Sequence, residues 1–248
     1  MYMDRVSTSA DGYVASEFAQ ARILITGLTA TAGVDVARSF ADVQARVIVH
    51  TADLSPELIE LVAVLTQSAD EIRLHTNDIS TADTAATFAQ TSAQTFGGLD
   101  AAINMASVSR SELEGIVRDQ DLDAFVSTKL GPLAQLTRVI ANRMALVLSE
   151  GLILNVLEMP HPRNRREAAV AGYIRTALAT MTTNEAHAWA AHGIRINAVG
   201  PCAIEDDELN AGAVITNEPD IGSLALYLAS RKGQALSGHV FDADGVAC

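Results

Sequence analysis

The sequence predicts a single α/β domain in which helices flank a doubly wound parallel sheet of about seven strands. Short apolar runs rich in β-branched residues alternate with segments of helical spacing, and this alternation is typical of βαβ units. The chain has 49% hydrophobic but only 4% aromatic residues, which suits a buried parallel sheet with an aliphatic core. Its 248 residues contain no repeat or Pro-rich linker. We therefore expect one domain over residues 21–248, preceded by a flexible, polar arm over residues 1–20.

The elements follow from the hydrophobic pattern and from residues that begin or end helices. Runs that predict strands are 22–26, 46–50, 72–75, 100–105, 152–157, 194–199 and 239–242. Helical spacing marks 33–40, 55–66, 84–96, 121–148, 168–191 and 221–230. Ser55-Pro56 provides a capping residue and a first-turn proline, whereas Gly131-Pro132 predicts an interruption of the helix 121–148. Together the elements predict one Rossmann-like domain.

Charge and cysteine content exclude several classes of function. The net charge of −13 argues against nonspecific nucleic-acid binding, which requires a basic surface, and against binding to an anionic membrane. No apolar run reaches transmembrane length. Cys202 and Cys248 give no disulfide framework, so we expect a cytoplasmic protein. The histidines show no spacing typical of a metal site, and we expect no metal.

The segment from Thr26 to Gly33 has the order that a pyrophosphate site needs, because it follows a predicted strand and opens a predicted helix. Backbone N–H groups at a helix N-terminus point at an anion, and glycines let the backbone approach it. Gly27 and Gly33 stand at the two ends of this loop. Asp53 follows the second strand, but with Ser55-Pro56 behind it turn or helix-cap chemistry is the simpler interpretation. The choice between NAD and NADP is therefore left open.

The loop resembles the Thr-Gly-x-x-x-Gly-x-Gly motif of the short-chain dehydrogenase/reductase family, with Thr31 in place of the middle glycine. Four further segments resemble motifs of the same family, in the same order: Asn77-Asp78-Ile79, Ile103 to Ser107, Gly193 to Pro201, and Ser237 to Gly245. The resemblance implies NAD or NADP as the cofactor and leaves open whether either binds. It implies that the cofactor-binding positions are Gly27, Thr31, Gly33, Asp78, Ile79, Asn104 and Ala106.

In this family a Tyr-x-x-x-Lys pair, a serine and an asparagine carry the proton chemistry. The resemblance assigns the tyrosine to Tyr173, the serine to Glu158 and the asparagine to Thr128. The lysine position is Ala177. Lowering the pKa of a free tyrosine from about 10 to about 7 requires roughly 4 kcal/mol, much of which a neighbouring ammonium can provide. We therefore expect a divergent member that lacks most of the catalytic set, with Tyr173 as a remnant.

Two other cationic features have simple interpretations. One of the two lysines, Lys129, lies on another predicted helix, where we expect it to face solvent or an interface. Three arginines, Arg163, Arg165 and Arg166, follow His161 beside the expected pocket. They suit a phosphate, a carboxylate or an acidic partner, but an ordinary exposed loop is the favoured interpretation.

Three functions remain open, and the sequence does not decide whether the protein is an enzyme. The leading hypothesis is a pseudoenzyme that serves as a scaffold or regulatory subunit, in a hetero-oligomer with an active homologue. The first alternative is an active NAD(P)-dependent carbonyl reductase or alcohol dehydrogenase with a non-standard site around Tyr173. The second is a small-molecule sensor that uses the old nucleotide crevice. The helices 121–148 and 168–191 resemble the family's dimer helices, so we expect a homodimer or homotetramer.

Overall fold

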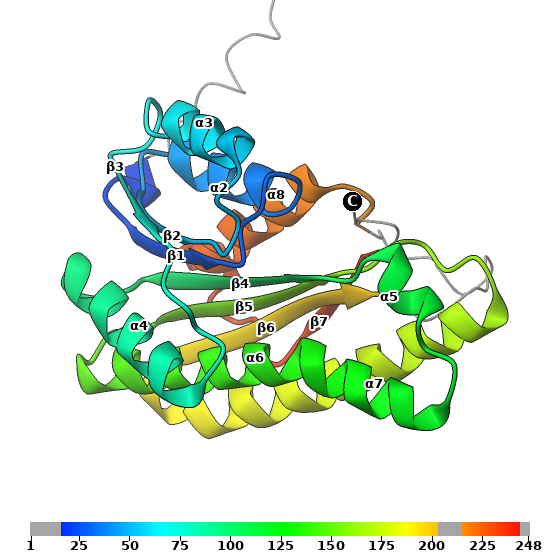
Figure 1. The fold of residues 1–248 in the computed structure, drawn as a ribbon. Coiled ribbons are helices and arrows are strands. Elements are labelled where there is room, and N and C mark those ends of the chain that lie inside the picture. Colours follow the sequence, from blue (N-terminus) through cyan, green and yellow to red (C-terminus); the bar gives the residue numbers. More distant parts are fainter. Residues whose placement is uncertain (1–15, 203–214, 244–248) are drawn as a thin grey trace, which may run out of the picture.

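Seven parallel strands form one continuous sheet at the centre of the molecule (Figure 1). The computed structural model describes residues 16–202 and 215–243. The strands are β1 (Arg22–Thr26), β2 (Arg46–His50), β3 (Glu71–His75), β4 (Ala101–Ser107), β5 (Gly151–Glu158), β6 (Ile194–Pro201) and β7 (Val240–Ala243). Their spatial order is β3-β2-β1-β4-β5-β6-β7, and every neighbouring pair is parallel. The predicted fold class is confirmed.

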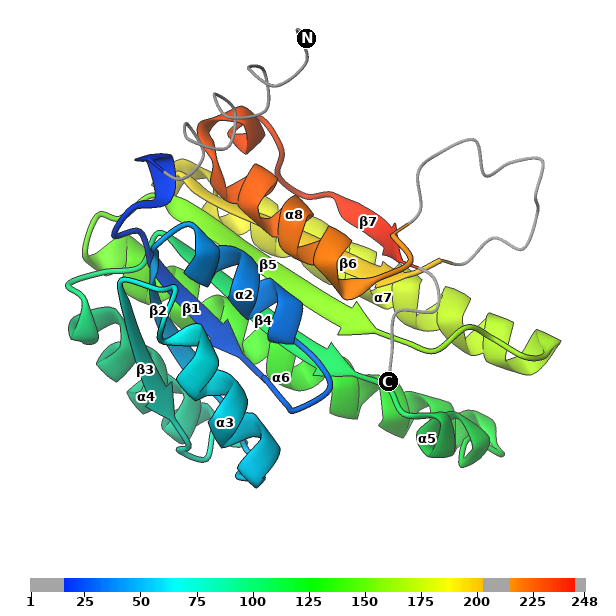
Figure 2. The ribbon, with the colours of Figure 1, turned by 90° about the horizontal axis from the view of Figure 1, so that it is seen from above.

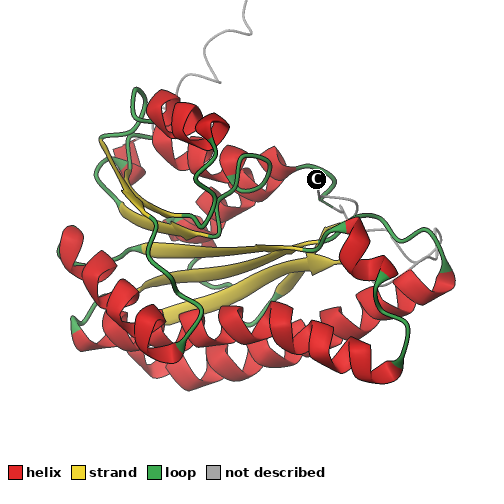
Figure 3. Ribbon diagram, in the orientation of Figure 1, coloured by secondary structure: helices red, strands yellow, loops and turns green. Residues whose placement is uncertain are grey.

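Helices cover both faces of the sheet. They are α2 (Val34–Asp42), α3 (Pro56–Leu65), α4 (Ala82–Thr95), α5 (Arg110–Glu114), α6 (Asp119–Leu146), α7 (Arg165–Trp189) and α8 (Glu218–Ala229). Seen from above, α2, α3 and α8 lie over one face (Figure 2), while α6 and α7 run beneath the other (Figure 3). In the described part of the chain no helix is long and apolar enough to cross a membrane.

The side chains of β5 show how the two faces are divided. Leu154 and Val156 join the core beneath α2 and α8, whereas Leu157 joins the core beneath α6 and α7. Successive residues of a strand point to opposite faces, so Glu158 shares the face of Val156. The last residue of β5 therefore points toward α2 and α8.

The long helix α6 runs without a break from Asp119 to Leu146, with Pro132 inside it. The predicted interruption at Gly131-Pro132 is wrong. Pro132 is exposed, while Leu133 and Leu136 are buried in the core. Packing of these leucines keeps the helix continuous where Pro132 cannot donate a backbone hydrogen bond, since tertiary contacts provide most of the stability of a helix.

The packed part of the chain begins slightly before the predicted domain boundary at residue 21. Residues 16–18 form a helical turn, and Phe18 is only 4% exposed. Its ring meets that of Phe40 edge-on, with 6.1 Å between the centroids. The remainder of the predicted arm, residues 1–15, lies outside the described residues.

Gly27→Ala tests how tightly the turn after β1 is constrained. Gly27 has φ of +78°, and a Cβ there would lie 2.2 Å from the Met105 carbonyl oxygen. We expect the free energy of unfolding, measured by urea titration, to fall by about 2 kcal/mol or more. The control is Gly131→Ala, where an added Cβ meets nothing within 4 Å and should stabilise the helix by roughly 0.5–1 kcal/mol. Equal unfolding midpoints for the two variants would contradict this prediction.

Candidate functional site

The turn between β1 and α2 lies where the strand order reverses, at the carboxyl edge of the sheet. In folds of this type ligands bind in the crevice at that point. Gly27 lets the turn pass against the Met105 carbonyl, and Gly33, with φ of +84°, is the N-cap residue of α2. Thr31 lies between them and is exposed. The two glycines that match the family motif therefore hold the backbone in conformations that other residues rarely adopt.

The amides of the loop already have acceptors within the chain. Thr29 Oγ1 accepts from the amides of Thr31 and Ala32, at 3.3 and 2.9 Å. Asp53 Oδ2 accepts from the Ala30 amide at 3.1 Å, while its Oδ1 accepts from Ser55 at 2.9 Å. These backbone hydrogen bonds, that of Ser55 first, hold the pKa of Asp53 below its usual value. Asp53 thus makes the turn contact predicted from the sequence and, in addition, a contact with the glycine loop.

The first turn of α2 receives a carboxylate from a distant part of the chain. Glu218, the first residue of α8, accepts through Oε1 from the amides of Asp35 at 2.6 Å and Val36 at 3.3 Å. Burial raises the pKa of Glu218, and backbone hydrogen bonds from α2 partly oppose that rise. These are the amides that a helix N-terminus offers to a phosphate. In this conformation the loop and the helix do not fit the diphosphate of a dinucleotide.

A second carboxyl group lies close to Glu218. Glu158 is 2% exposed, and its Oε1 has no hydrogen-bond partner among the described residues. Burial, and then the charge of Glu218, raise the pKa of Glu158 to about 8. The position that the resemblance assigns to the family's serine therefore holds a carboxylic acid that keeps its proton at neutral pH.

Asn104 lies inside the sheet rather than in the crevice. It is fully buried, its Oδ1 accepts from Thr26 Oγ1 at 3.1 Å, and its Nδ2 donates to Asn155 Oδ1 at 3.0 Å. Asn155 Oδ1 also accepts from Thr137 Oγ1 of α6 at 3.0 Å. The Asn104 side chain, predicted to bind a cofactor, thus links β4 to β1 and β5, and Asn155 extends the network to α6.

The other predicted cofactor positions lie at the ends of β3 and β4. Asp78 is exposed, and its carboxylate accepts from the amide and the hydroxyl of Ser80, each at 2.9 Å. These bonds hold the pKa of Asp78 below its usual value. Ile79 is partly buried against the core under α4 and α6, and Ala106 against the core under α6 and α7. Asp78 also borders a hollow of about 350 Å³ beside α4.

Tyr173 points away from the crevice. Its side chain is 48% exposed, and its hydroxyl donates to Asp123 Oδ1 of α6 at 3.4 Å. The part of α7 that packs against the end of β5 contains the fully buried Ala171, in one core cluster with Leu157 and Met159. Among the described contacts, Tyr173 and the buried carboxyl group at the end of β5 are not brought together.

The basic residues of α7 are also turned elsewhere. Ala177, to which the resemblance assigns the position of the family's lysine, is partly buried in the core under α6 and α7. Arg175 binds Asp242 of β7, with 2.6 Å between Nε and Oδ1, and so points away from Tyr173. Arg165 and Arg166 are exposed, as expected of a surface segment, but they are the first residues of α7 rather than part of a loop.

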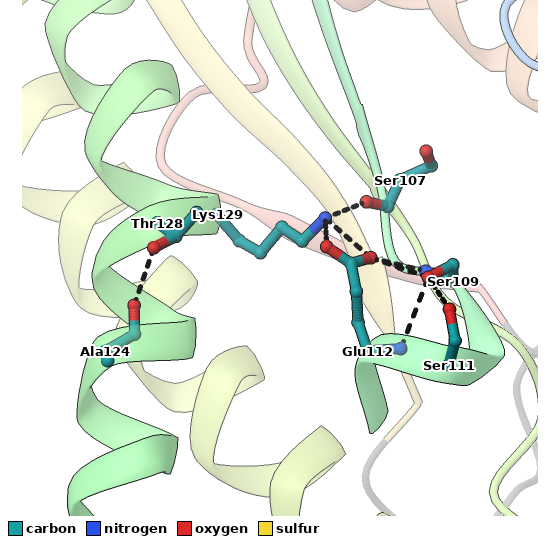
Figure 4. A network of polar contacts seen from close by, with 7 residues as sticks. All are labelled: Ser107, Ser109, Ser111, Glu112, Ala124, Thr128 and Lys129. Atoms are coloured by element: carbon teal, nitrogen blue, oxygen red, sulfur yellow. Dashed lines mark hydrogen bonds and ion pairs between the residues drawn. The ribbon is translucent and has the colours of Figure 1, made fainter. Parts of the chain in front are cut away.

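The described lysine nearest to the carboxyl edge of β4 comes from α6 (Figure 4). Thr128 is exposed, and its hydroxyl donates to the Ala124 carbonyl at 2.8 Å. The next residue, Lys129, has a side chain only 15% exposed. Its Nζ donates to the Ser107 carbonyl at 2.7 Å and pairs with Glu112 at 2.7 Å. The expectation that Lys129 faces solvent is wrong, because α5, which the sequence does not predict, supplies its partner.

Known proteins resemble the chain over most of its length. The family model described as short chain dehydrogenase matches residues 21–213. The chain is 25% identical to galactitol 2-dehydrogenase of Agrobacterium fabrum over 250 residues, 90% of this chain and 95% of that protein. It is 28% identical to the mitochondrial borneol dehydrogenase of Lavandula x intermedia over 244 residues, 90% of this chain and 88% of that protein.

The solved structures show the same fold. A short-chain type dehydrogenase/reductase from Mycobacterium marinum has a TM-score of 0.73 at 18% identity, covering 94% of this chain and 97% of that one. A hydroxysteroid dehydrogenase from Escherichia coli has a TM-score of 0.70 at 20% identity, covering 95% of this chain and 100% of that one. With the sequence match over residues 21–213, the chain belongs to the short chain dehydrogenase family.

Proposed function

We propose that the protein is an NAD(P)-dependent oxidoreductase that acts on an alcohol or carbonyl compound, with Glu158 as its proton-carrying residue. Family membership supports the reaction class. Two similar proteins are dehydrogenases of galactitol and of borneol, which are both alcohols. The observation that carries the proposal is the buried Glu158 carboxyl group at the end of β5.

Glu158 has the two properties that a general acid or base needs. Its pKa of about 8 lies near neutral pH, where proton transfer in both directions is efficient. Its Oε1 has no hydrogen-bond partner among the described residues, so a substrate oxygen can take that place. A buried, perturbed and unpartnered carboxyl group is typical of a functional site.

This proposal adopts the active alternative of the sequence analysis but moves its centre from Tyr173 to Glu158. Tyr173 is half exposed and directed toward α6, whereas Glu158 lies on the α2 and α8 side of the sheet and interacts electrostatically with Glu218. In the reductive direction the protonated carboxyl group donates to the substrate oxygen. In the oxidative direction the carboxylate accepts that proton.

The second candidate is the subunit without turnover that the sequence analysis favoured. It is supported by the occupation of the α2 amides by Glu218 and by Ala177 at the lysine position. A scaffold needs the fold but not an open crevice. The two candidates differ in whether any alcohol is oxidised.

Substitution of Glu158 tests the proposed role. We expect purified protein to oxidise at least one of a panel of sugar alcohols and cyclic alcohols with NAD⁺ or NADP⁺. Glu158→Gln should lower kcat/KM by about 10²–10⁴-fold, the usual contribution of a general acid–base group, and Tyr173→Phe should leave it within about twofold. Loss of activity in the tyrosine variant alone would move the role to Tyr173. Absence of turnover from both wild type and Glu218→Gln would favour the scaffold.

The protonation of Glu158 also predicts how stability depends on pH. Because its pKa is about 8 in the folded protein and 4.5 as the ordinary value, the folded state holds a proton that the unfolded state releases between these limits. Stability should therefore fall across that window by up to about 1.4 kcal/mol per pH unit, and then level off. Urea titrations should show Glu158→Gln gaining on wild type from pH 5 to pH 8. The exposed Glu57→Gln is the control, and a pH-independent difference for Glu158→Gln would exclude the buried acid.

A further inference from the structure

The helix α2 has no capping side chain of its own, because its N-cap residue is Gly33. At α3, α4, α7 and α8 the cap is local, because Ser55, Thr81, Asn164 and Asn217 each accept from an amide at the start of their own helix. The first amides of a helix need acceptors. At α2 the acceptor is Glu218, 183 residues away in the sequence from Asp35.

We infer that Glu218 is an internal ligand of the nucleotide site. Its carboxylate binds the amides that receive a dinucleotide's diphosphate, and it must leave them before the cofactor binds. This assignment rests on the NAD(P)-dependent function proposed above. It makes Glu218 a residue that sets cofactor affinity without contacting the substrate.

The competition follows from the chemistry of the donors. A carboxylate oxygen and a phosphate oxygen are both anionic acceptors that the positive end of a helix stabilises. Glu218 Oε1 lies 2.6 Å from the Asp35 amide, which is the distance of a strong charge-assisted hydrogen bond. A phosphate oxygen cannot share that position, so binding of a diphosphate requires Glu218 to be displaced.

The buried carboxyl group of Glu158 is a second, independent indication of a ligand at this place. It is 2% exposed and its Oε1 is unpartnered among the described residues, although buried polar groups are normally hydrogen-bonded. Glu158 interacts electrostatically with Glu218, so the two carboxyl groups lie near each other. The two acids lie near the end of a helix that favours anions, and Oε1 of Glu158 lacks a hydrogen bond there that a ligand can supply.

The side chain of Glu218, rather than the helix that carries it, is the part that can move. One turn further along α8, a Cβ on Gly222 would lie 2.3 Å from Ser39 Oγ and 3.1 Å from the Asp35 carbonyl oxygen. The body of α8 is therefore packed tightly against α2. Glu218 itself is only partly buried, so rotation about its side-chain bonds carries the carboxylate into solvent and frees the amides.

Calorimetry on the full chain tests this with ADP, which carries the diphosphate, and with AMP, which does not. We expect Glu218→Ala to bind ADP, NADH and NADPH at least tenfold more tightly than wild type, with Glu218→Gln intermediate because it keeps an acceptor but loses the charge. The affinity for AMP should change by less than about threefold. Asp220→Asn, in the same turn of α8, is the control for through-space charge and should leave all affinities unchanged.

Hydrogen exchange reports on the amides directly. In wild type the amides of Asp35 and Val36 should exchange slowly, in Glu218→Ala they should exchange faster, and ADP should slow them again. An ADP affinity in Glu218→Ala within twofold of wild type, or no binding of ADP by any variant, overturns the inference. Tighter ADP binding without alcohol oxidation leaves it standing and removes the proposed function. If wild type oxidises an alcohol and binds NADH as tightly as Glu218→Ala does, the proposed function stands and the inference about Glu218 is overturned.

Discussion

A row of hydrogen bonds inside the sheet determines where the site can form. It runs from Thr26 through Asn104 to Asn155 and ends at Thr137 of α6. Thr26, Asn104 and Asn155 are also direct neighbours in the strand register. Because a slip by one residue would turn each buried amide toward the wrong face, this row fixes β1, β4 and β5 relative to one another. The positions of the glycine turn, of the Met105 carbonyl and of the Glu158 carboxyl group follow from that register.

In the crevice that results, the backbone favours an anionic ligand, but the side chains that contact it are themselves acids. The backbone offers amides that favour an anion, as in any sheet with this strand order. The side chains supply three acids of the chain itself, Asp53, Glu158 and Glu218. Two of them bind the amides, and the third remains protonated beside them. The α2 and loop amides are thus satisfied without a ligand, while Oε1 of the buried Glu158 has no hydrogen-bond partner among the described residues.

Much of the fold was predictable from the sequence because it depends on local patterns. The β-branched runs around Ile23 and Val47 indicate buried strands, and the loop from Gly27 to Gly33 marks the turn at the switch point. The break at Pro132 was a local inference that tertiary packing overrode. The short helix α5 was missed because five residues carry too little periodicity, although the Ser109 and Glu112 capping box that begins it is visible in the sequence.

The site was less predictable because it depends on the direction of side chains from distant elements. The sequence shows that a tyrosine lies on the expected helix. It does not show its direction, because a difference of one or two positions along α7 decides whether a side chain faces β5 or α6. The meeting of Glu218 with α2 depends on how α8 docks, and no local signal announces it. The contacts of Lys129 could not be predicted from the sequence, because its partners, Ser107 and Glu112, come from β4 and α5.

The ion pair of Lys129 has a practical consequence for handling the protein. The chain has only two lysines, and Lys129 is engaged by Glu112 and largely covered. Lys232 is exposed in the short 3₁₀ helix that follows α8, at the amino-terminal edge of the sheet. Of these two amines, an acylating reagent will therefore modify Lys232 first. A tether or fluorophore attached there leaves the carboxyl edge, with its crevice, open to the solution.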